Sequence, residues 1–382
     1  MRIGVDLLWV RPGICGGTES VIRNLLDGFG EFDKENEYVL FVAKDNAETF
    51  AQYEKEPQMT LVRCNVKCSF QPVRILWENL FLDGKAGKEN IDVMFIPVYS
   101  MPRTHGSGIP YVCTIHDLQA IHYPRYFSAL KRLFLKQAWD YACRKAERIV
   151  TISDYCKNDL IKHYPEAENK VTTIYDAVAS NQSDMPFSEI ASKYGLEQGK
   201  YYYCVSSMLP HKNLETVLRV MELRKHRGEN IPLVLSGVGG RNADFEEKVD
   251  ALKIDDMVIN TGFVSDAERD CLYENCRLFL FPSVFEGFGM PPIEAMRRGK
   301  QVVMTRESCL EEVTEGKAVY VDSPYDIEEW SRKIDAALQK TPDIQPFERY
   351  QLENVVREYV KAFCKMVGFN RKSDSYEAGK PT

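Results

Sequence analysis

The sequence predicts an α/β protein with two Rossmann-like domains, each built on a doubly wound parallel sheet. The chain has 382 residues, which is too long for one ordinary domain and suits two of roughly 150–200 residues each. Short apolar runs alternate with helical patterns almost throughout, as expected for parallel sheets that are covered by helices on both faces. The alternation pauses in the polar stretch 179–198 and then begins again.

The first series of elements predicts an N-terminal domain over residues 1–180. Its strands are expected at residues 2–5, 38–42, 59–62, 93–96, 111–115 and 149–152. Residues 18–29 carry apolar side chains at helical spacing behind Gly16 and Gly17, so a helix should follow the first strand.

The second series predicts a C-terminal domain over residues 195–345, after a linker near 180–198. Its strands are expected at residues 201–205, 233–235, 257–259, 278–281, 301–304 and 318–321. A last helix at 347–367 should pack back toward the N-terminal domain, and the polar tail 371–382 should be disordered. Ligands of such sheets bind beyond the carboxyl ends of the strands, here in a cleft between the domains.

Composition and charge narrow the class of protein. The chain is 44% hydrophobic and 27% charged, with a formal net charge of −7, so a basic footprint for nucleic acid is missing. No apolar run is long enough for a membrane span, and residues 1–6 resemble a strand rather than a signal peptide, which favours a cytoplasmic protein. The cysteines number eleven, and several lie in strand-like runs, so reduced buried thiols are favoured over disulfides or zinc.

Several phosphate and metal motifs are absent from the sequence. It has no Gly-x4-Gly-Lys-Ser/Thr loop and no Asp-x-Asp, and its six histidines lack metal-ligand spacing. The glycine-rich stretch 237–240 follows a strand but lacks the third glycine of a dinucleotide fingerprint. We therefore expect no metal ion and no cofactor.

The strongest motif is Phe285-Glu-Gly-Phe-Gly-Met-Pro-Pro-Ile-Glu-Ala295, which follows an apolar strand and opens a helix. Gly287 and Gly289 allow a ligand to approach the backbone, and the two prolines suit a first helical turn. A helix start favours a phosphate or a polar sugar. Glu286 and Glu294 could face the same ligand, although a solvated loop residue and a helix-dipole partner remain the alternatives.

This motif resembles the Glu-x7-Glu signature of the family 4 glycosyltransferases, which have the GT-B fold. The resemblance spans nearly the whole chain, because other segments follow in the order of the family. These are Gly16-Gly17, Arg74-x-x-Trp77-Glu78, Thr114-Ile-His-Asp-Leu118, Ile152-Ser-x-x-Cys-Lys-x-Asp-Leu160, Pro210-His-Lys-Asn-Leu214, Gly262-Phe-Val264 and Leu310-Glu-Glu-Val313.

The resemblance implies a metal-independent, retaining hexosyltransferase of class EC 2.4. Such an enzyme moves a hexosyl or deoxyhexosyl group from a GDP- or UDP-linked sugar to a glycan or a lipid-linked acceptor, as in cell-surface polysaccharide biosynthesis. The donor would lie mainly on the C-terminal domain and the acceptor mainly on the N-terminal one. The alternatives are a nucleotide-sugar epimerase or a sugar phosphorylase of the same fold, and a catalytically idle module that binds a nucleotide sugar.

The resemblance also assigns roles to residues of the nucleoside and sugar sites. Glu294 would accept hydrogen bonds from the ribose hydroxyls, and Glu286 would contact the transferred sugar. Phe263 and Val264 would hold the base through main-chain groups, with core packing as the alternative for Phe263.

A leaving diphosphate gains negative charge and needs a compensating cation. Lys212 is the candidate, and a solvated surface lysine is the alternative. Many members of the family carry an arginine five residues earlier, where this chain has Ser207, and a related subgroup has arginine in place of His211, so the cation count stays open. The donor phosphates and sugar are expected at Gly16, Gly17, His211, Lys212, Gly287, Phe288, Gly289 and Met290.

Two N-terminal features complete the predicted site. His116 stands at the carboxyl end of a strand and would hydrogen-bond the donor sugar, unless it is structural. Gly16 and Gly17 would let the first loop approach the donor phosphates or the acceptor, or simply form a turn.

The segment 126–148 is predicted to be an amphipathic helix. Its apolar face is expected to comprise Leu130, Leu133, Phe134, Ala138 and Trp139, with Lys131, Arg132 and Lys136 beside it. A solvated face is the default interpretation. The alternative is contact with anionic lipid or a lipid-linked acceptor, which would place the protein at the inner face of the cell membrane.

Overall fold

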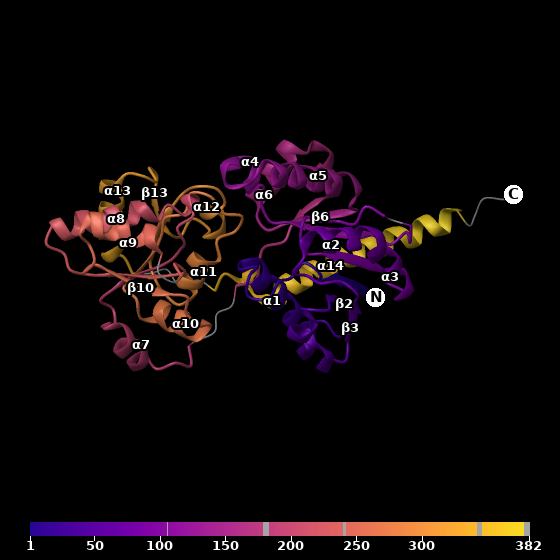
Figure 1. The fold of residues 1–382 in the computed structure, drawn as a ribbon, viewed down its shortest axis with the longest axis horizontal. Coiled ribbons are helices and arrows are strands. Elements are labelled where there is room, and N and C mark those ends of the chain that lie inside the picture. Colours follow the sequence, from indigo (N-terminus) through magenta and orange to yellow (C-terminus); the bar gives the residue numbers. More distant parts are fainter. Residues whose placement is uncertain (105, 179–182, 240–241, 342–345, 378–382) are drawn as a thin grey trace. The chain divides into compact units, whose positions relative to one another are not determined.

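The computed structural model describes residues 1–104, 106–178, 183–239, 242–341 and 346–377, without the side chains of 369–377. The chain forms two compact units, of which one comprises residues 1–177 and 348–382 and the other residues 178–347 (Figure 1). Both are α/β units with an all-parallel sheet, so the predicted fold class is confirmed.

The sheet of the N-terminal unit has seven strands in the order β3-β2-β1-β4-β5-β6-β7. The strands are β1 (Arg2–Asp6), β2 (Glu37–Ala43), β3 (Met59–Cys64), β4 (Val93–Ile96), β5 (Tyr111–Ile115), β6 (Arg148–Thr151) and β7 (Val171–Thr173). Six match predicted strands. The three-residue β7 is missing from the prediction, since Val171 is its one apolar residue.

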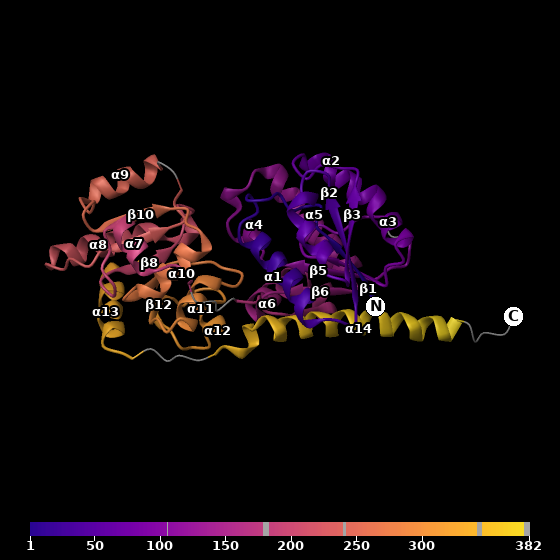
Figure 2. The same cartoon turned by 90° about the horizontal axis from the view of Figure 1, so that it is seen from below.

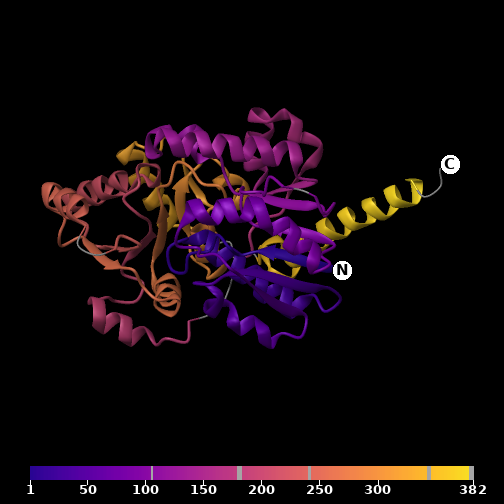
Figure 3. The same cartoon turned by 45° about the vertical axis from the view of Figure 1, so that its right-hand side comes forward.

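Helices cover this sheet on both faces (Figure 2). They are α1 (Gly17–Phe32), α2 (Gln71–Trp77), the π-helix η2 (Glu78–Leu82), α3 (Asp83–Lys88), α4 (Gln119–His122), α5 (Ala129–Lys145), α6 (Asp154–His163) and α14 (Leu352–Glu377). The last helix packs on α1 and β4, although it follows the second unit in the chain. Its final turns extend past the rest of the unit (Figure 3).

Aromatic rings fill the space between α14 and the sheet. Tyr359 and Phe363 lie 5.3 and 5.4 Å from the ring of Phe95, and Phe363 lies 6.3 Å from the ring of Phe29. Gly28 brings α1 and α14 close together, because a Cβ at that position would lie 2.7 Å from Val356 Cγ2 and 2.8 Å from Leu352.

The sheet of the second unit has six strands in the order β10-β9-β8-β11-β12-β13. They are β8 (Tyr202–Val205), β9 (Leu233–Ser236), β10 (Val258–Gly262), β11 (Leu278–Phe281), β12 (Val302–Thr305) and β13 (Val319–Val321). The helices are α7 (Phe187–Tyr194), α8 (Leu214–His226), α9 (Ala243–Leu252), α10 (Asp266–Asn275), α11 (Met290–Arg297), α12 (Leu310–Val313) and α13 (Ile327–Leu338). Leu218, Leu235 and Trp330 lie in its buried core.

The structure differs from the prediction in the expected linker between the two sheets and in the last helix of the chain. The expected linker 180–198 contains helix α7. This helix belongs to the second unit, because its residue Ile190 is fully buried and the helix contacts α10. Residues 179–182 lie outside the described residues. The expected helix 347–367 begins only at Leu352, after a 3₁₀ turn, and continues to Glu377, through part of the expected disordered tail. Residues 378–382 are again outside the described residues.

Helix α5 also differs from its predicted pattern. Its buried residues are Leu135, Trp139, Ala142 and Cys143. The expected apolar face was wrong for Leu130 and Leu133, whose side chains are 78% and 54% exposed. None of the helices in the described parts of the chain combines the length and apolar character needed to cross a membrane.

The α1–α14 contact generates a stability prediction. Gly28→Ala should lower the free energy of unfolding by about 1–2 kcal/mol, because overpacking costs more than alanine gains in helix propensity. The matched control is Gly84→Ala in α3, where an added Cβ meets nothing within 4 Å, so the same exchange should be neutral or stabilising. Chemical denaturation of both variants measures the difference. Equal stabilisation by both would contradict the close packing of α14.

Candidate functional site

In the second unit, three of the expected residues follow strands of one parallel sheet. Lys212, Phe263 and Glu286 come after β8, β10 and β11, whose last residues are Val205, Gly262 and Phe281. Strands β8 and β11 are neighbours in the sheet. Because parallel strands end at one edge, the loops carrying Lys212 and Glu286 meet there.

Lys212 and Glu286 form an ion pair. Lys212 Nζ donates to Glu286 Oε1 over 2.6 Å, and the two side chains are only 25% and 14% exposed. The surface-lysine interpretation of Lys212 therefore does not fit. A half-buried cation and carboxylate in contact can each exchange the partner for a ligand group, namely a phosphate for Lys212 and sugar hydroxyls for Glu286.

Buried hydrogen bonds fix the loop that carries Glu286. Ser283 Oγ donates to the carbonyl of His211 over 3.2 Å, and the Val284 amide donates to the same carbonyl over 2.8 Å. From the other side, the Glu286 amide donates to Ser308 Oγ over 3.0 Å, and Cys309 Sγ lies 3.2 Å from the Phe288 carbonyl. The loops after β8 and β12 thus hold the loop after β11 between them.

Gly289 begins helix α11. Its φ is +87° and a Cβ there would meet Leu310 Cδ2 at 2.8 Å, so both backbone conformation and space require glycine. Met290 is the first helical residue and Pro291 follows it in the first turn. Gly287 and Phe288 are buried behind this turn.

Glu294 lies on α11 against the neighbouring helix α10. The hydroxyl of the buried Tyr273 donates to Glu294 Oε2 over 2.9 Å. Burial, Glu294 and Tyr203 raise the pKa of Tyr273 well above its ordinary value, so it stays a donor. Burial opposes the charge of Arg269, but Glu294 and two aspartates raise its pKa. One oxygen of Glu294 is thus fixed, and the carboxylate keeps further acceptor capacity for a vicinal diol.

Phe263 stands on the surface, directly after β10. Its side chain is 82% exposed, so the core-packing alternative is wrong. Its ring lies over Gly239, where an added Cβ would sit 2.0 Å from the ring. Val264 is half-buried, and α10, which carries Tyr273, begins two residues later.

His211 is buried and uncharged at neutral pH. Burial, together with the neighbouring Lys212, lowers the pKa of His211 to about 4. Ser207 carries no charge at all. Lys212 is therefore the cation among the expected phosphate-binding residues of this unit.

In the N-terminal unit, His116 follows β5 as predicted. Its Nε2 lies 2.9 Å from the carbonyl oxygen of Pro97, which fixes a proton on Nε2 and leaves Nδ1 as the acceptor in the neutral ring. Cys156 Sγ donates to the His116 carbonyl over 3.0 Å. Burial raises the pKa of Asp176 to about 6, although the nearby His116 lowers it.

His116 lines a cavity of about 410 Å³, which lies within the size range of small-molecule sites. Its walls come from the loop after β1 and the start of α1, from α2, from the segments after β4 and β5, from α4, and from α5 with the segment before it. The residues are Trp9, Arg11, Ile14, Cys15, Thr18, Gln71, Arg74, Val98, Tyr99, Ser100, His116, Asp117, Gln119, Ala120, Phe127, Lys131, Leu135 and Trp139.

Gly16 and Gly17 lie at the N-terminus of helix α1. Gly16 precedes the helix with φ +57° and ψ −138°, a conformation that favours glycine, and an added Cβ would meet nothing within 4 Å. Gly17 is the first helical residue. Their neighbours Cys15 and Thr18 line the cavity.

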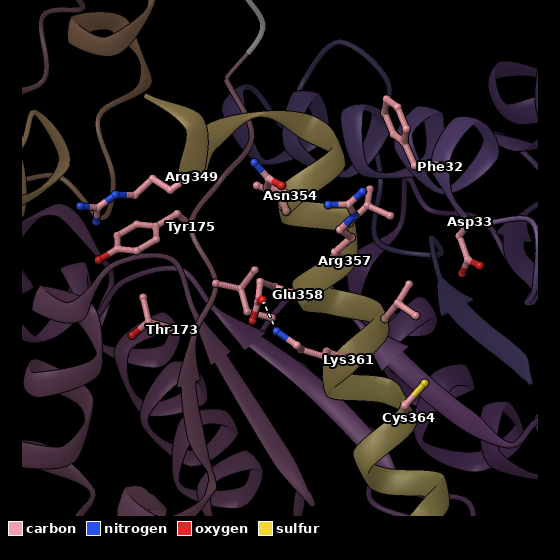
Figure 4. A pocket seen from close by; sticks show the side chains of 14 residues that line it. Phe32, Asp33, Thr173, Tyr175, Arg349, Asn354, Arg357, Glu358, Lys361 and Cys364 are labelled. Carbon is pink, nitrogen blue, oxygen red and sulfur yellow. Dashed lines mark hydrogen bonds and ion pairs between the residues drawn. The ribbon is translucent and has the colours of Figure 1, made fainter. Parts of the chain in front are cut away.

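A second hollow in the same unit, of about 850 Å³, lies along α14 (Figure 4). Tyr175, Arg349 and Lys361 are among its lining residues, and Glu358 pairs with Lys361 over 2.7 Å. None of the predicted site residues lines it.

Several supporting residues were missed by the sequence analysis. Tyr273 orients Glu294, and Ser308 and Cys309 hold the loop of Glu286. Each is distant in sequence from its partner, and no motif marks it. Across the residues that the structure describes, no group of three or more His, Cys, Asp or Glu is placed to hold a metal ion.

Two family descriptions match successive parts of the chain. Residues 15–182 match the description "Glycosyltransferase Family 4", and residues 187–353 match "Glycosyl transferases group 1".

Curated relatives support the same family. The O-antigen chain mannosyltransferase B of Escherichia coli is 28% identical over 60% of this chain and 61% of its own. The O-antigen chain mannosyltransferase RfbU of Salmonella typhimurium is 28% identical over 62% of this chain and 63% of its own. The chain thus spans about three fifths of the length of these relatives.

Solved structures share the fold. A glycosyltransferase from Rickettsia africae has a TM-score of 0.72 at 17% identity, covering 96% of this chain and 98% of that one. WaaG, a glycosyltransferase involved in lipopolysaccharide biosynthesis, has a TM-score of 0.64 at 16% identity, covering 94% and 95%. With the two family matches and the glutamate motif at the start of α11, the chain belongs to the family 4 glycosyltransferases.

Proposed function

We propose that the protein is a retaining glycosyltransferase of cell-surface polysaccharide biosynthesis, which moves a hexosyl or deoxyhexosyl group from a GDP- or UDP-linked sugar to a glycan or lipid-linked acceptor. The observation that carries the proposal is the Lys212–Glu286 pair beside the start of α11. It offers a cation and helix amides for a diphosphate, and a carboxylate for a sugar. The relatives named O-antigen mannosyltransferases favour a hexosyl donor.

The proposed reaction needs no metal ion or cofactor. The bond between the anomeric carbon and the phosphate oxygen breaks, and the acceptor hydroxyl attacks from the same face. Its proton passes to the departing phosphate oxygen. Lys212 and the amides at Met290 stabilise the charge that develops on the diphosphate, and neutral His211 adds none.

Glu294 would bind the ribose, with Phe263 and Val264 at the base. The hydrogen bond from the Tyr273 hydroxyl to Glu294 Oε2 supports this assignment. It orients the carboxylate, which keeps acceptor capacity for the two ribose hydroxyls. His116 would present Nδ1 to a hydroxyl of the donor sugar, and Gly16 and Gly17 would let the first loop approach the donor phosphates or the acceptor.

We also propose a cytoplasmic protein with peripheral contact at anionic membrane. Exposed Leu130 and Leu133 stand beside exposed Arg132 and Lys136 on α5, a combination typical of interfacial helices. A second exposed apolar strip runs along α2 and η2 and comprises Phe70, Val73, Leu76, Leu80 and Phe81. Arg103 links η2 to α5, because its amide donates a hydrogen bond to Asn79 Oδ1 and its carbonyl accepts one from the Tyr141 hydroxyl.

The alternatives differ in what they release. An epimerase would convert the donor without an acceptor, and an idle binding module would bind the nucleotide sugar without turnover. Formation of free nucleotide diphosphate only when a glycan or lipid-linked acceptor is present supports the transferase.

Glu294→Ala should weaken nucleotide diphosphate binding at least tenfold, because two hydrogen bonds to a charged acceptor are lost, each contributing about 1.5–3 kcal/mol. Calorimetry with UDP and GDP measures the dissociation constants. Glu247→Ala, at an exposed position on α9, is the matched control and should bind normally. Unchanged affinity of Glu294→Ala for both nucleotides would contradict the assignment of Glu294 to the ribose hydroxyls.

Lys212→Ala should reduce kcat by about 10²–10³ with a smaller effect on donor binding, because the cation interacts most strongly with the developing charge. Steady-state kinetics at saturating donor in EDTA measures this, with exposed Lys200→Ala as the control. Lys212→Arg should keep part of the rate. Normal turnover of Lys212→Ala would remove the proposed role, and wild-type activity that required Mg²⁺ or Mn²⁺ would remove the metal-free chemistry.

His211 should make folding stability depend on pH. Its folded pKa of about 4 lies below its ordinary value of 6.5, so the unfolded chain binds more protons between these limits. The contribution is complete above pH 6.5 and is lost as the pH falls toward 4. Chemical denaturation of His211→Gln and wild type at pH 7 and 4.5 should show the stability difference shrinking by about 2–3 kcal/mol. Parallel pH profiles of the two proteins would contradict a buried neutral histidine.

A further inference from the structure

Two residues that line the cavity beside His116 each carry a buried N–H group without an acceptor. Among the residues that the structure describes, Arg74 Nε and Trp139 Nε1 are shielded from water and make no hydrogen bond. Both residues line the cavity, and they are only 7% and 3% exposed. A buried donor without a partner costs free energy. Two in the walls of one cavity indicate a ligand rich in acceptor oxygens.

A buried carboxylate fixes Arg74 at the cavity wall. Its Nη1 donates to Glu78 Oε1 over 2.5 Å, one turn later on the same helical segment. Asp6 lies nearby at the end of β1 and is 1% exposed. Burial raises the pKa values of Glu78 and Asp6, and the charge of Asp6 raises the pKa of Glu78 further, although Arg74 opposes both shifts. The two carboxyls therefore hold a proton more readily than ordinary ones, which leaves the guanidinium less fully neutralised.

Further cations and aromatic rings complete the walls. Arg11 lies on the loop after β1, and Lys131 on α5. Lys131 Nζ lies 3.3 Å from the hydroxyl of Tyr99, whose ring lies 6.3 Å from that of Trp139. Asp117 is an anionic residue that also lines the cavity. Its Oδ1 accepts a hydrogen bond from the Gln119 amide over 2.9 Å. Three cations and several aromatic rings suit a phosphate attached to a sugar ring.

We propose that this cavity binds the phosphate group of a phosphorylated acceptor, through Arg74, Arg11, Lys131 and the indole N–H of Trp139. The inference rests on the proposed transferase function, whose acceptor class it names. A neutral glycan offers acceptor oxygens but no negative charge, whereas a phosphate group has acceptor-only oxygens that carry the charge opposite to that of Arg74, Arg11 and Lys131. The phosphate belongs either to a lipid-linked sugar diphosphate or to a soluble sugar phosphate.

Binding of two phosphate probes to the full-length chain tests the inference. Glucose 1-phosphate represents the soluble source and farnesyl diphosphate the lipid-linked source, and calorimetry is run with and without saturating nucleotide diphosphate. We expect the probe to bind in both conditions, because saturating nucleotide diphosphate occupies the donor site and leaves the cavity beside His116 free. Tighter binding of farnesyl diphosphate assigns the lipid-linked source, and tighter binding of glucose 1-phosphate the soluble one.

Variants locate the bound phosphate. Arg74→Met should weaken probe binding at least tenfold, and Arg11→Ala and Lys131→Ala by smaller factors, while nucleotide diphosphate binding stays unchanged. Arg144→Met is the matched control, since Arg144 is 63% exposed on the same helix as Lys131 and pairs with Asp140. The double variant Arg74→Met/Glu78→Met removes both members of the buried pair, which proteins often tolerate, so it keeps the test valid if Arg74→Met unfolds.

Three results would overturn the inference. They are no probe binding by the wild type, complete loss of probe binding when nucleotide diphosphate is added, and unchanged affinity in a folded Arg74 variant. Failure of the proposed function is seen separately, as absence of nucleotide diphosphate binding in the same titrations.

Discussion

The parallel register of the two sheets is the constraint on which the candidate site depends. Every strand in a parallel sheet ends at the same edge, so loops that are distant in sequence meet there. In the second unit this edge joins the loop after β8 to the loop after β11, and the result is the contact of Lys212 with Glu286 across 74 residues. In the N-terminal unit, His116 follows β5 in the same way and lines a cavity with residues from the loop after β1.

The sequence reveals elements better than it reveals their connections. Strands such as 93–96, 111–115 and 278–281 are predicted with the bounds that the structure has, because they are buried on both faces and read as unbroken apolar runs. Helix α7 was missed because one buried residue, Ile190, attaches it to its unit. In α5 the buried Trp139 belongs to the predicted apolar face, but Leu130 and Leu133 of that face are exposed.

The same distinction applies to the candidate site. Motif spacing identifies Glu286, Glu294 and Lys212 as candidates, but it carries no information on which side chain touches which. Tyr273 and Ser308 reach their glutamates only through the packing of separate elements. The charge of His211 is also mainly a property of packing, because burial is the largest cause that lowers its pKa and the adjacent Lys212 is the second.

The Lys212–Glu286 pair gives a partly buried cation and a partly buried carboxylate a partner each. Each side chain is desolvated, and an unpaired charge in such a place is costly. Pairing them satisfies both until a donor arrives. In the proposed complex the diphosphate takes over Lys212 while the sugar hydroxyls take over Glu286, so neither charge loses its partners at any stage. A ligand with a phosphate but no sugar would leave Glu286 with fewer hydrogen bonds than before. If the proposed reaction holds, the pair would therefore favour an intact nucleotide sugar over the nucleotide diphosphate that remains after transfer, which would assist release of the product.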